Sequence, residues 1–82
     1  MENELLANLD RLHTTELGVL RIKRNLALDT VDVISWCKDR CKTADSIIRK
    51  GKNYYVYIDN SIITINAHSF TIITAHKEKT NK

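Results

Sequence analysis

The stretch YYVYIDNSIITIN, residues 54–66, decides the fold. In it, β-branched and aromatic residues alternate with polar ones, and this period of two is typical of strands with one buried face. Asp59 and Asn60 interrupt the alternation and favour a tight turn. The stretch therefore predicts two strands, residues 54–58 and 61–66, joined by that turn.

The strand pattern continues on both sides of this hairpin. Residues 46–49 predict a short edge strand, which a turn at residues 50–53 connects to the hairpin. Residues 70–76 predict the last strand, after a loop near His68. Because connections this short join antiparallel neighbours, we expect an antiparallel sheet of three to four strands.

Ahead of the sheet, apolar residues recur at helical spacing. Residues 2–12 predict an amphipathic helix that ends before His13. Thr14 or Thr15 can cap a second helix, and Glu16 suits its first turn. The apolar residues that we expect this second helix to present to the protein are Leu17, Leu20 and Leu26.

A third helix is predicted to begin at Asp29, with Asp32 three residues further on. Its apolar stripe is expected to consist of Val33, Ile34, Cys37, Cys41 and Ala44. The 82 residues suffice for one core only. We therefore expect a single α+β domain over residues 1–82, with two or three N-terminal helices packed on one face of the sheet and residues 78–82 as a flexible tail.

The composition is that of a globular protein, with 43% hydrophobic and 28% charged residues. The acidic, amphipathic start does not resemble a secretory signal, and no run of ~18 apolar residues is present to span a membrane. We therefore expect a cytoplasmic protein without membrane association. In that compartment Cys37 and Cys41 should remain thiols.

Positive charge is concentrated in the second part of the chain. Residues 1–32 hold six acids against four bases, a balance of −2, whereas residues 33–82 hold nine bases against four acids, a balance of +5. The second part should therefore attract polyanions such as nucleic acids, although solvated surface charge would give the same count.

The predicted strands place polar side chains together on the face away from the helices. Alternation assigns Tyr55, Tyr57, Thr64 and Asn66 to this open face. Thr74 and His76 join them if Ile73 and Ala75 are buried. An open antiparallel face is ordinarily polar, so its existence alone does not indicate a function.

Cations alternate with tyrosines around the first turn of the sheet, and single-stranded nucleic acids are bound by such surfaces through phosphate pairing and base stacking. Tyrosine is also a common strand residue, so the pattern has a purely structural alternative. The residues expected to contact nucleic acid are Arg49, Lys50, Lys52, Tyr55, Tyr57, Asn66, Lys77 and Arg21.

Histidine is the natural candidate for a general acid or base, because its pKa lies near neutrality. His76, beside Thr74 on the last strand, is the first candidate, and His13 is the second. Cys37 and Cys41 could bind zinc only with two further ligands, such as His13 and His68, and core thiols are the commoner outcome of their spacing. We expect no metal and no cofactor.

Four segments resemble a small bacterial and phage domain family of unknown function, family 3781. They are LHTTELGVLRIKRNL (residues 12–26), DVISWCK (32–38), RKGKNYYVYID (49–59) and TINAHSFTIITAHK (64–77). The resemblance covers nearly the whole chain. It implies a stable small domain and no established activity.

More distantly, helices followed by a sheet that ends in FTIITAHK resemble the small ribonucleases of the barnase, EndoU, colicin and RelE-like group. This resemblance implies that RNA binds to the sheet and that His76 or His13 deprotonates the ribose 2′-hydroxyl. It also implies roles for two further groups of residues. Lys52, Arg49 or Arg21 would stabilise the charge on the phosphate, and Thr74 and Tyr55 would position it.

The leading hypothesis is therefore a small cytoplasmic RNA-binding protein, a metal-independent ribonuclease of a toxin or mobile-element system that acts through its open sheet face. A non-enzymatic phage or mobile-element inhibitor of a host defence complex, similar to an anti-CRISPR protein, is the alternative. A nucleotide-binding sponge is a third reading. The expected partner is RNA or another nucleic acid, or a protein under the alternative, and the expected state is a monomer or homodimer.

Overall fold

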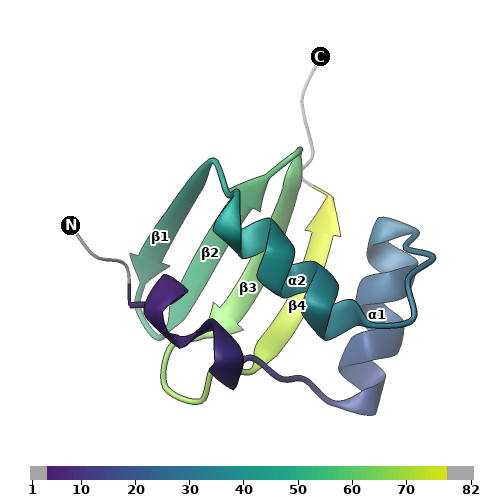
Figure 1. Cartoon of the computed structure of the whole chain (residues 1–82), viewed down its shortest axis with the longest axis horizontal. Coiled ribbons are helices and arrows are strands. Elements are labelled where there is room, and N and C mark those ends of the chain that lie inside the picture. The colour runs from purple at the N-terminus through teal and green to yellow at the C-terminus, as the bar shows by residue number, and fades with distance from the viewer. Residues whose placement is uncertain (1–3, 78–82) are drawn as a thin grey trace.

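The structure is a computed structural model that describes residues 4–77, and it confirms the α+β class (Figure 1). None of the helices within these residues has the length and apolar character needed to cross a bilayer. The elements in chain order are the 3-10 helix η1 (Leu6–Arg11), the helices α1 (Glu16–Leu26) and α2 (Val33–Lys42), and the strands β1 (Ser46–Lys50), β2 (Asn53–Ile58), β3 (Ser61–Asn66) and β4 (Ile72–Lys77).

The four strands form one antiparallel sheet in the order β1-β2-β3-β4. The short β1 strand and the hairpin of β2 and β3 are confirmed where the sequence placed them. In the turn between β2 and β3, Asp59 and Asn60 both have positive φ, at 49° and 62°. Two successive residues in this conformation match the twist of a two-residue hairpin.

β4 contains an irregularity that the alternation did not reveal. Thr64 pairs with Thr74 and Ile65 pairs with Ile72, so Ile73 is an extra residue between two regular pairs. The condition that Ile73 be buried is therefore not met, since Ile73 is 39% exposed. After Ile73, side chains again alternate between the two faces of the sheet. Thr74 therefore lies on the open face and Ala75 is buried, as anticipated.

The helices cover the sheet in two ways (Figure 1). η1 and α2 lie over one face and enclose the core with β2 and β3. α1 instead runs beside β4, where the Asn25 side chain donates to the Ala75 carbonyl at 3.2 Å. The buried core consists of Leu5, Leu12, Ile22, Leu26, Val33, Cys37, Cys41, Tyr54, Val56, Ile63, Ile65, Phe70, Ile72 and Ala75.

α1 presents a different face from the one predicted. Thr15 caps it by accepting a bond from the Gly18 amide at 3.0 Å. Leu26 is buried as expected, but Leu17 and Leu20 are 70% and 63% exposed. Gly18 and Ile22 occupy the protein-facing side instead. Glycine at this position allows close approach, because a Cβ atom there would collide with the Thr14 side chain.

The predicted helix over residues 2–12 is also wrong in type. Only the 3-10 helix η1 forms, and residues 1–3 lie outside the described part of the chain. Asn8 has non-helical backbone angles inside η1, and its side chain donates to the Glu4 carbonyl at 2.8 Å. Such a local bond competes with a regular helix, which is marginal at this length. Leu5 and Leu12 are nevertheless buried.

The N-cap of α2 is Asp32 rather than Asp29, and the helix begins at Val33. The Asp32 carboxylate accepts bonds from the Ser35 amide at 3.0 Å and the Ser35 hydroxyl at 2.9 Å, and these bonds lower its pKa. Val33 and the two cysteines form the predicted buried stripe. Burial raises the pKa of Cys37 to about 12 and that of Cys41 to about 11, so both remain thiols at neutral pH.

Candidate nucleic-acid interface

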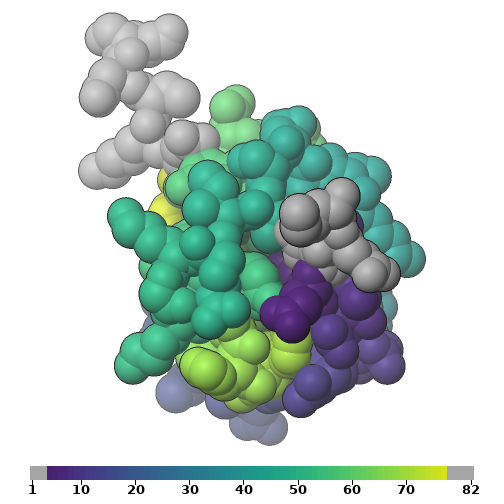
Figure 2. All heavy atoms as spheres, turned by 90° about the vertical axis from the view of Figure 1, so that its left-hand side faces the viewer, coloured from purple at the N-terminus to yellow at the C-terminus, as the bar shows by residue number. Residues whose placement is uncertain are grey.

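One end of the sheet brings together three segments that are distant in sequence. The turn after β1 contacts the loop after β3, because the Ala67 amide donates to the Lys52 carbonyl at 2.7 Å. The segment between η1 and α1 joins the same loop through a parallel bridge between His13 and Thr71. We call this region, residues 11–13, 49–53 and 66–71, the loop end; it lies at the bottom of Figures 1 and 2.

His13 is held in one orientation by two hydrogen bonds. Its Nδ1 lies 2.9 Å from the Arg11 carbonyl oxygen, and since a carbonyl only accepts, Nδ1 must carry the hydrogen. In the neutral ring Nε2 then has a lone pair, which faces the Thr71 hydroxyl at 3.0 Å. This is the arrangement of a base whose tautomer is fixed by a third group.

The hydroxyl chain continues beyond Thr71. The Ser69 hydroxyl lies 2.7 Å from that of Thr71. Asn66 holds this loop together, because its side-chain oxygen accepts bonds from the His68 and Ser69 amides, both at 2.9 Å. Asn66, predicted as a nucleic-acid contact, thus has its oxygen engaged within the protein. The sequence analysis did not identify Thr71, Ser69 or Arg11 as site residues.

Positive charge gathers around this histidine. Lys50 at the end of β1 and Lys52 in the turn after it are both exposed. Arg49 pairs with Tyr54 across the strands, so it lies on the helix-covered side of the sheet rather than on the open face. Arg11 and Arg49 stack on the rings of Phe70 and Tyr54, at 4.6 and 5.5 Å from the ring centroids.

The other end of the sheet, which we call the turn end, comprises residues 59–61 and 76–77. His76 and Lys77 are exposed there, and the His76 ring makes no hydrogen bond with any residue that the structure describes. His76, near the end of β4, stands five residues after Thr71, which precedes the strand; at ~3.3 Å per residue this is a separation of up to about 16 Å. The two candidate histidines therefore belong to separate places, and Thr74 lies between them.

The open face is more apolar than the sequence suggested. Tyr55 and Tyr57 lie on it half-buried, as predicted. Ile48 pairs with Tyr55 and is 46% exposed, and Ile62 pairs with Tyr57. Lys50 is the cation that strand pairing assigns to this face.

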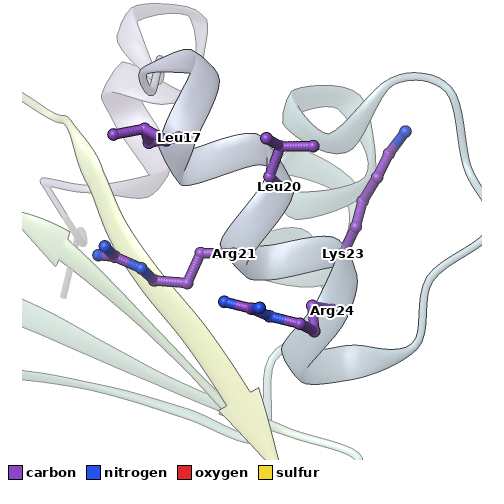
Figure 3. Close-up of a pocket in the computed structure, with 5 residues that line it drawn as sticks. All are labelled: Leu17, Leu20, Arg21, Lys23 and Arg24. Atoms are coloured by element: carbon purple, nitrogen blue, oxygen red, sulfur yellow. The ribbon is translucent and has the colours of Figure 1, made fainter.

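Arg21 belongs to a third region, the outer side of α1. It lines an open hollow there, and Figure 3 shows Arg21 and Arg24 extending toward β4 while Lys23 points away. The remaining lining residues are Leu17 and Leu20. Because all five residues come from one helix, this hollow does not enclose a ligand by itself.

The possible zinc ligands are not assembled. Cys37 and Cys41 are buried in the core, whereas His13 and His68 are exposed at the loop end. Within residues 4–77 no group of three or more histidine, cysteine, aspartate or glutamate side chains is placed to hold a metal ion.

Comparison with known proteins identifies the chain only at the level of a family. No curated protein and no solved structure matches it, so the resemblance to small ribonucleases gains no support. Residues 6–76 match the family described as "Protein of unknown function (DUF3781)". This match spans nearly all of the 82 residues, and the chain therefore belongs to the DUF3781 family.

Proposed function

We propose that this protein binds RNA at its loop end and cleaves it without a metal, with His13 as the general base. The observation that carries the proposal is the His13 ring, whose Nδ1 is tied to the Arg11 carbonyl while Nε2 faces a hydroxyl. A 2′-hydroxyl of RNA can take the place of the Thr71 hydroxyl at this nitrogen. We further propose that the protein acts in the cytoplasm, within a toxin or mobile-element system.

The charge around His13 supports binding of a polyanion. Arg11, Arg49, Lys50 and Lys52 all lie exposed at the loop end. Exposed cations pair with phosphates and release the counterions that surround a nucleic acid. Tyr55 lies on the adjoining open face, where an aromatic ring can stack with a base.

The proposed reaction is a transesterification within the RNA. His13 Nε2 takes the proton of the 2′-hydroxyl, and the 2′-oxygen attacks the adjacent phosphorus. The bond from phosphorus to the 5′-oxygen breaks, and that oxygen takes a proton from water. His13 then gives its proton to the hydroxide that remains, which restores the water and the neutral base. The products are a 2′,3′-cyclic phosphate and a free 5′-hydroxyl. Arg11, whose own carbonyl oxygen holds the His13 ring, stabilises the negative charge that develops on the phosphate.

The test compares His13→Ala with His76→Ala, a matched change of the same residue type at the turn end. Purified proteins are incubated with labelled RNA in EDTA, and cleavage is followed on a gel. We expect His13→Ala to lower the rate by roughly 10²- to 10⁴-fold, the usual contribution of a general base. His76→Ala should cleave like the parent protein. Loss of cleavage in His76→Ala alone, or equal cleavage in both variants, would contradict the proposal.

A second candidate function rests on exposed apolar side chains. Leu17 and Leu20 on α1, and Ile48 and Ile73 on the sheet, are between 39% and 70% exposed. Apolar side chains in such positions favour a protein partner, as a non-enzymatic inhibitor of a host defence complex would need. Under this candidate, no RNA product forms. Leu17→Ser with Leu20→Ser would then abolish inhibition while His13→Ala would preserve it.

A further inference from the structure

Two arginines and two aromatic rings form one row at the loop end. The Arg11 guanidinium lies 4.6 Å from the centroid of Phe70, the Phe70 and Tyr54 rings stack at 6.4 Å, and Arg49 lies 5.5 Å from the centroid of Tyr54. We propose that this row is a clamp for two separated phosphates of an unpaired RNA strand. This inference rests on the proposed function and names its substrate.

Stacking prepares each guanidinium to bind an anion. A guanidinium that lies over a ring uses its flat face, so the N–H groups at its edge can still donate to a phosphate. Arg49 is fixed further, because its Nε donates to the Gly51 carbonyl at 2.9 Å and its side chain also interacts with the Tyr54 hydroxyl. A guanidinium carries five N–H groups, so others remain for a phosphate. Ordering these side chains before binding lowers the entropy lost when the ligand arrives.

Within residues 4–77, neither arginine of the row makes an ion pair. The ion pair found in this part of the chain joins Arg40 and Asp59, far from the loop end. Glu4 is the carboxylate in contact with the row, and it accepts a hydrogen bond from the Tyr54 hydroxyl at 3.2 Å. This bond fixes the Tyr54 ring beneath Arg49.

The backbone of Phe70 connects the clamp to the proposed base. Phe70 has a φ of +59°, a conformation that is sparsely populated for an aromatic residue. The surrounding loop imposes it, since the Phe70 amide donates to the Asn66 carbonyl at 2.9 Å and its own carbonyl accepts from the His13 amide at 3.2 Å. The residue that supports Arg11 thus also positions His13, so a strand held by the clamp passes the base.

The geometry favours an unpaired strand over a duplex. Each guanidinium lies over a different ring of the stacked pair, so the row offers two separate positions for phosphates along one strand. In-line attack by a 2′-hydroxyl also requires a nucleotide that has left the regular A-form stack. Proteins reach such nucleotides in single strands, loops and bulges.

The experiment measures binding without cleavage. The probe is a 2′-O-methyl RNA of roughly ten nucleotides, within the usual range of single-strand sites, and the same sequence as a duplex is the comparison. Affinity is measured over a range of salt concentrations for the parent protein, Arg11→Ala, Arg49→Ala and the control Lys77→Ala at the turn end. Each arginine variant should bind more weakly and lose about 0.7 from the slope of log affinity against log salt. Lys77→Ala should change neither.

A second set of variants separates the stack from the charge. Arg11→Lys keeps the charge but loses the planar group, so we expect its affinity to approach that of Arg11→Ala. Phe70→Leu should weaken binding with the salt slope unchanged, and combining it with Arg11→Ala should add no further loss. Melting curves establish that each variant is folded.

The outcomes distinguish the clamp from the function on which it rests. If the parent protein does not bind the RNA at all, the proposed function fails together with the clamp. If it binds and Arg11→Ala and Arg49→Ala bind as tightly as Lys77→Ala, the clamp is overturned while RNA binding stands. Equal affinity for the duplex and the single strand would overturn the choice of substrate.

Discussion

The two ends of β4 carry similar residue types but differ in what surrounds them. At the loop end, Thr71 contacts a histidine from another part of the chain, and that histidine is fixed by a backbone carbonyl. At the turn end, His76 is exposed beside Lys77. Within residues 4–77, other segments hold the loop-end histidine in place, whereas none makes a hydrogen bond to the His76 ring. A strand rich in polar residues is therefore not a site until other segments fix its side chains.

The two ends of the sheet also differ in charge. The loop end combines Arg11, Arg49 and the lysines of the first turn. At the turn end, Asp59 lies 3.8 Å from Arg40 with its side chain 78% exposed, so charges of both signs are present and solvated. A phosphate backbone should consequently prefer the loop end.

The largest expected effect comes from reversing charge at one end and then at the other. Lys50→Glu with Lys52→Glu should lower RNA affinity by about 10- to 100-fold at low salt, because two phosphate contacts become repulsive. Lys77→Glu should lower it by no more than about twofold, an effect of net charge alone. Filter binding or fluorescence anisotropy at two salt concentrations measures both. Equal losses at the two ends would show that binding follows net charge and not location.

Much of the fold was predictable because its determinants are local. The period of two across residues 54–66 and the Asp59-Asn60 turn gave the central hairpin, and the Val33, Cys37 and Cys41 spacing gave the buried face of α2. These patterns reflect which side of one element is buried. The buried side of a single helix or strand can therefore be predicted from residues that are close together in the sequence.

The candidate site was only partly predictable, because its contacts are long-range. His13 and Thr71 are 58 residues apart, and no local pattern indicates that they meet. The bulge at Ile73 and the exposure of Leu17 also depend on how α1 docks beside β4. His13 was a candidate from its chemistry alone. His76 was the first candidate because Thr74 is close to it in the sequence. Within residues 4–77, however, the His76 ring forms no hydrogen bond with Thr74 or with any other residue.

A smaller effect should follow from removing the side chain that organises the loop. Asn66→Ala deletes the oxygen that accepts two amide bonds in the loop after β3, and we expect it to lower the free energy of unfolding by about 1 kcal/mol. Cleavage should fall as well, because Ser69 and Thr71 lose their placement. Ser61→Ala at the turn end is the control, expected within ~0.5 kcal/mol of the parent. Urea unfolding measures the free energy of unfolding, and the RNA gel measures cleavage. An Asn66→Ala protein with full activity would show that the loop after β3 is not needed for the site.

The smallest effect should come from improving the turn end. Asn60 has a φ of 62° after Asp59 at 49°, and an Asp-Gly pair suits this turn better than Asp-Asn. Asn60→Gly removes the steric cost of a left-handed residue, which is about 1 kcal/mol or less for asparagine. It also increases the entropy of the unfolded chain, which costs about 0.5 kcal/mol. The net gain should be at most ~0.5 kcal/mol, a rise in Tm of roughly 2 to 4 °C.

Since the turn end takes no part in the proposed reaction, cleavage by Asn60→Gly should equal that of the parent protein. A clear change in cleavage would mean that the turn end contributes to the site after all, and the distinction between the two ends would be lost.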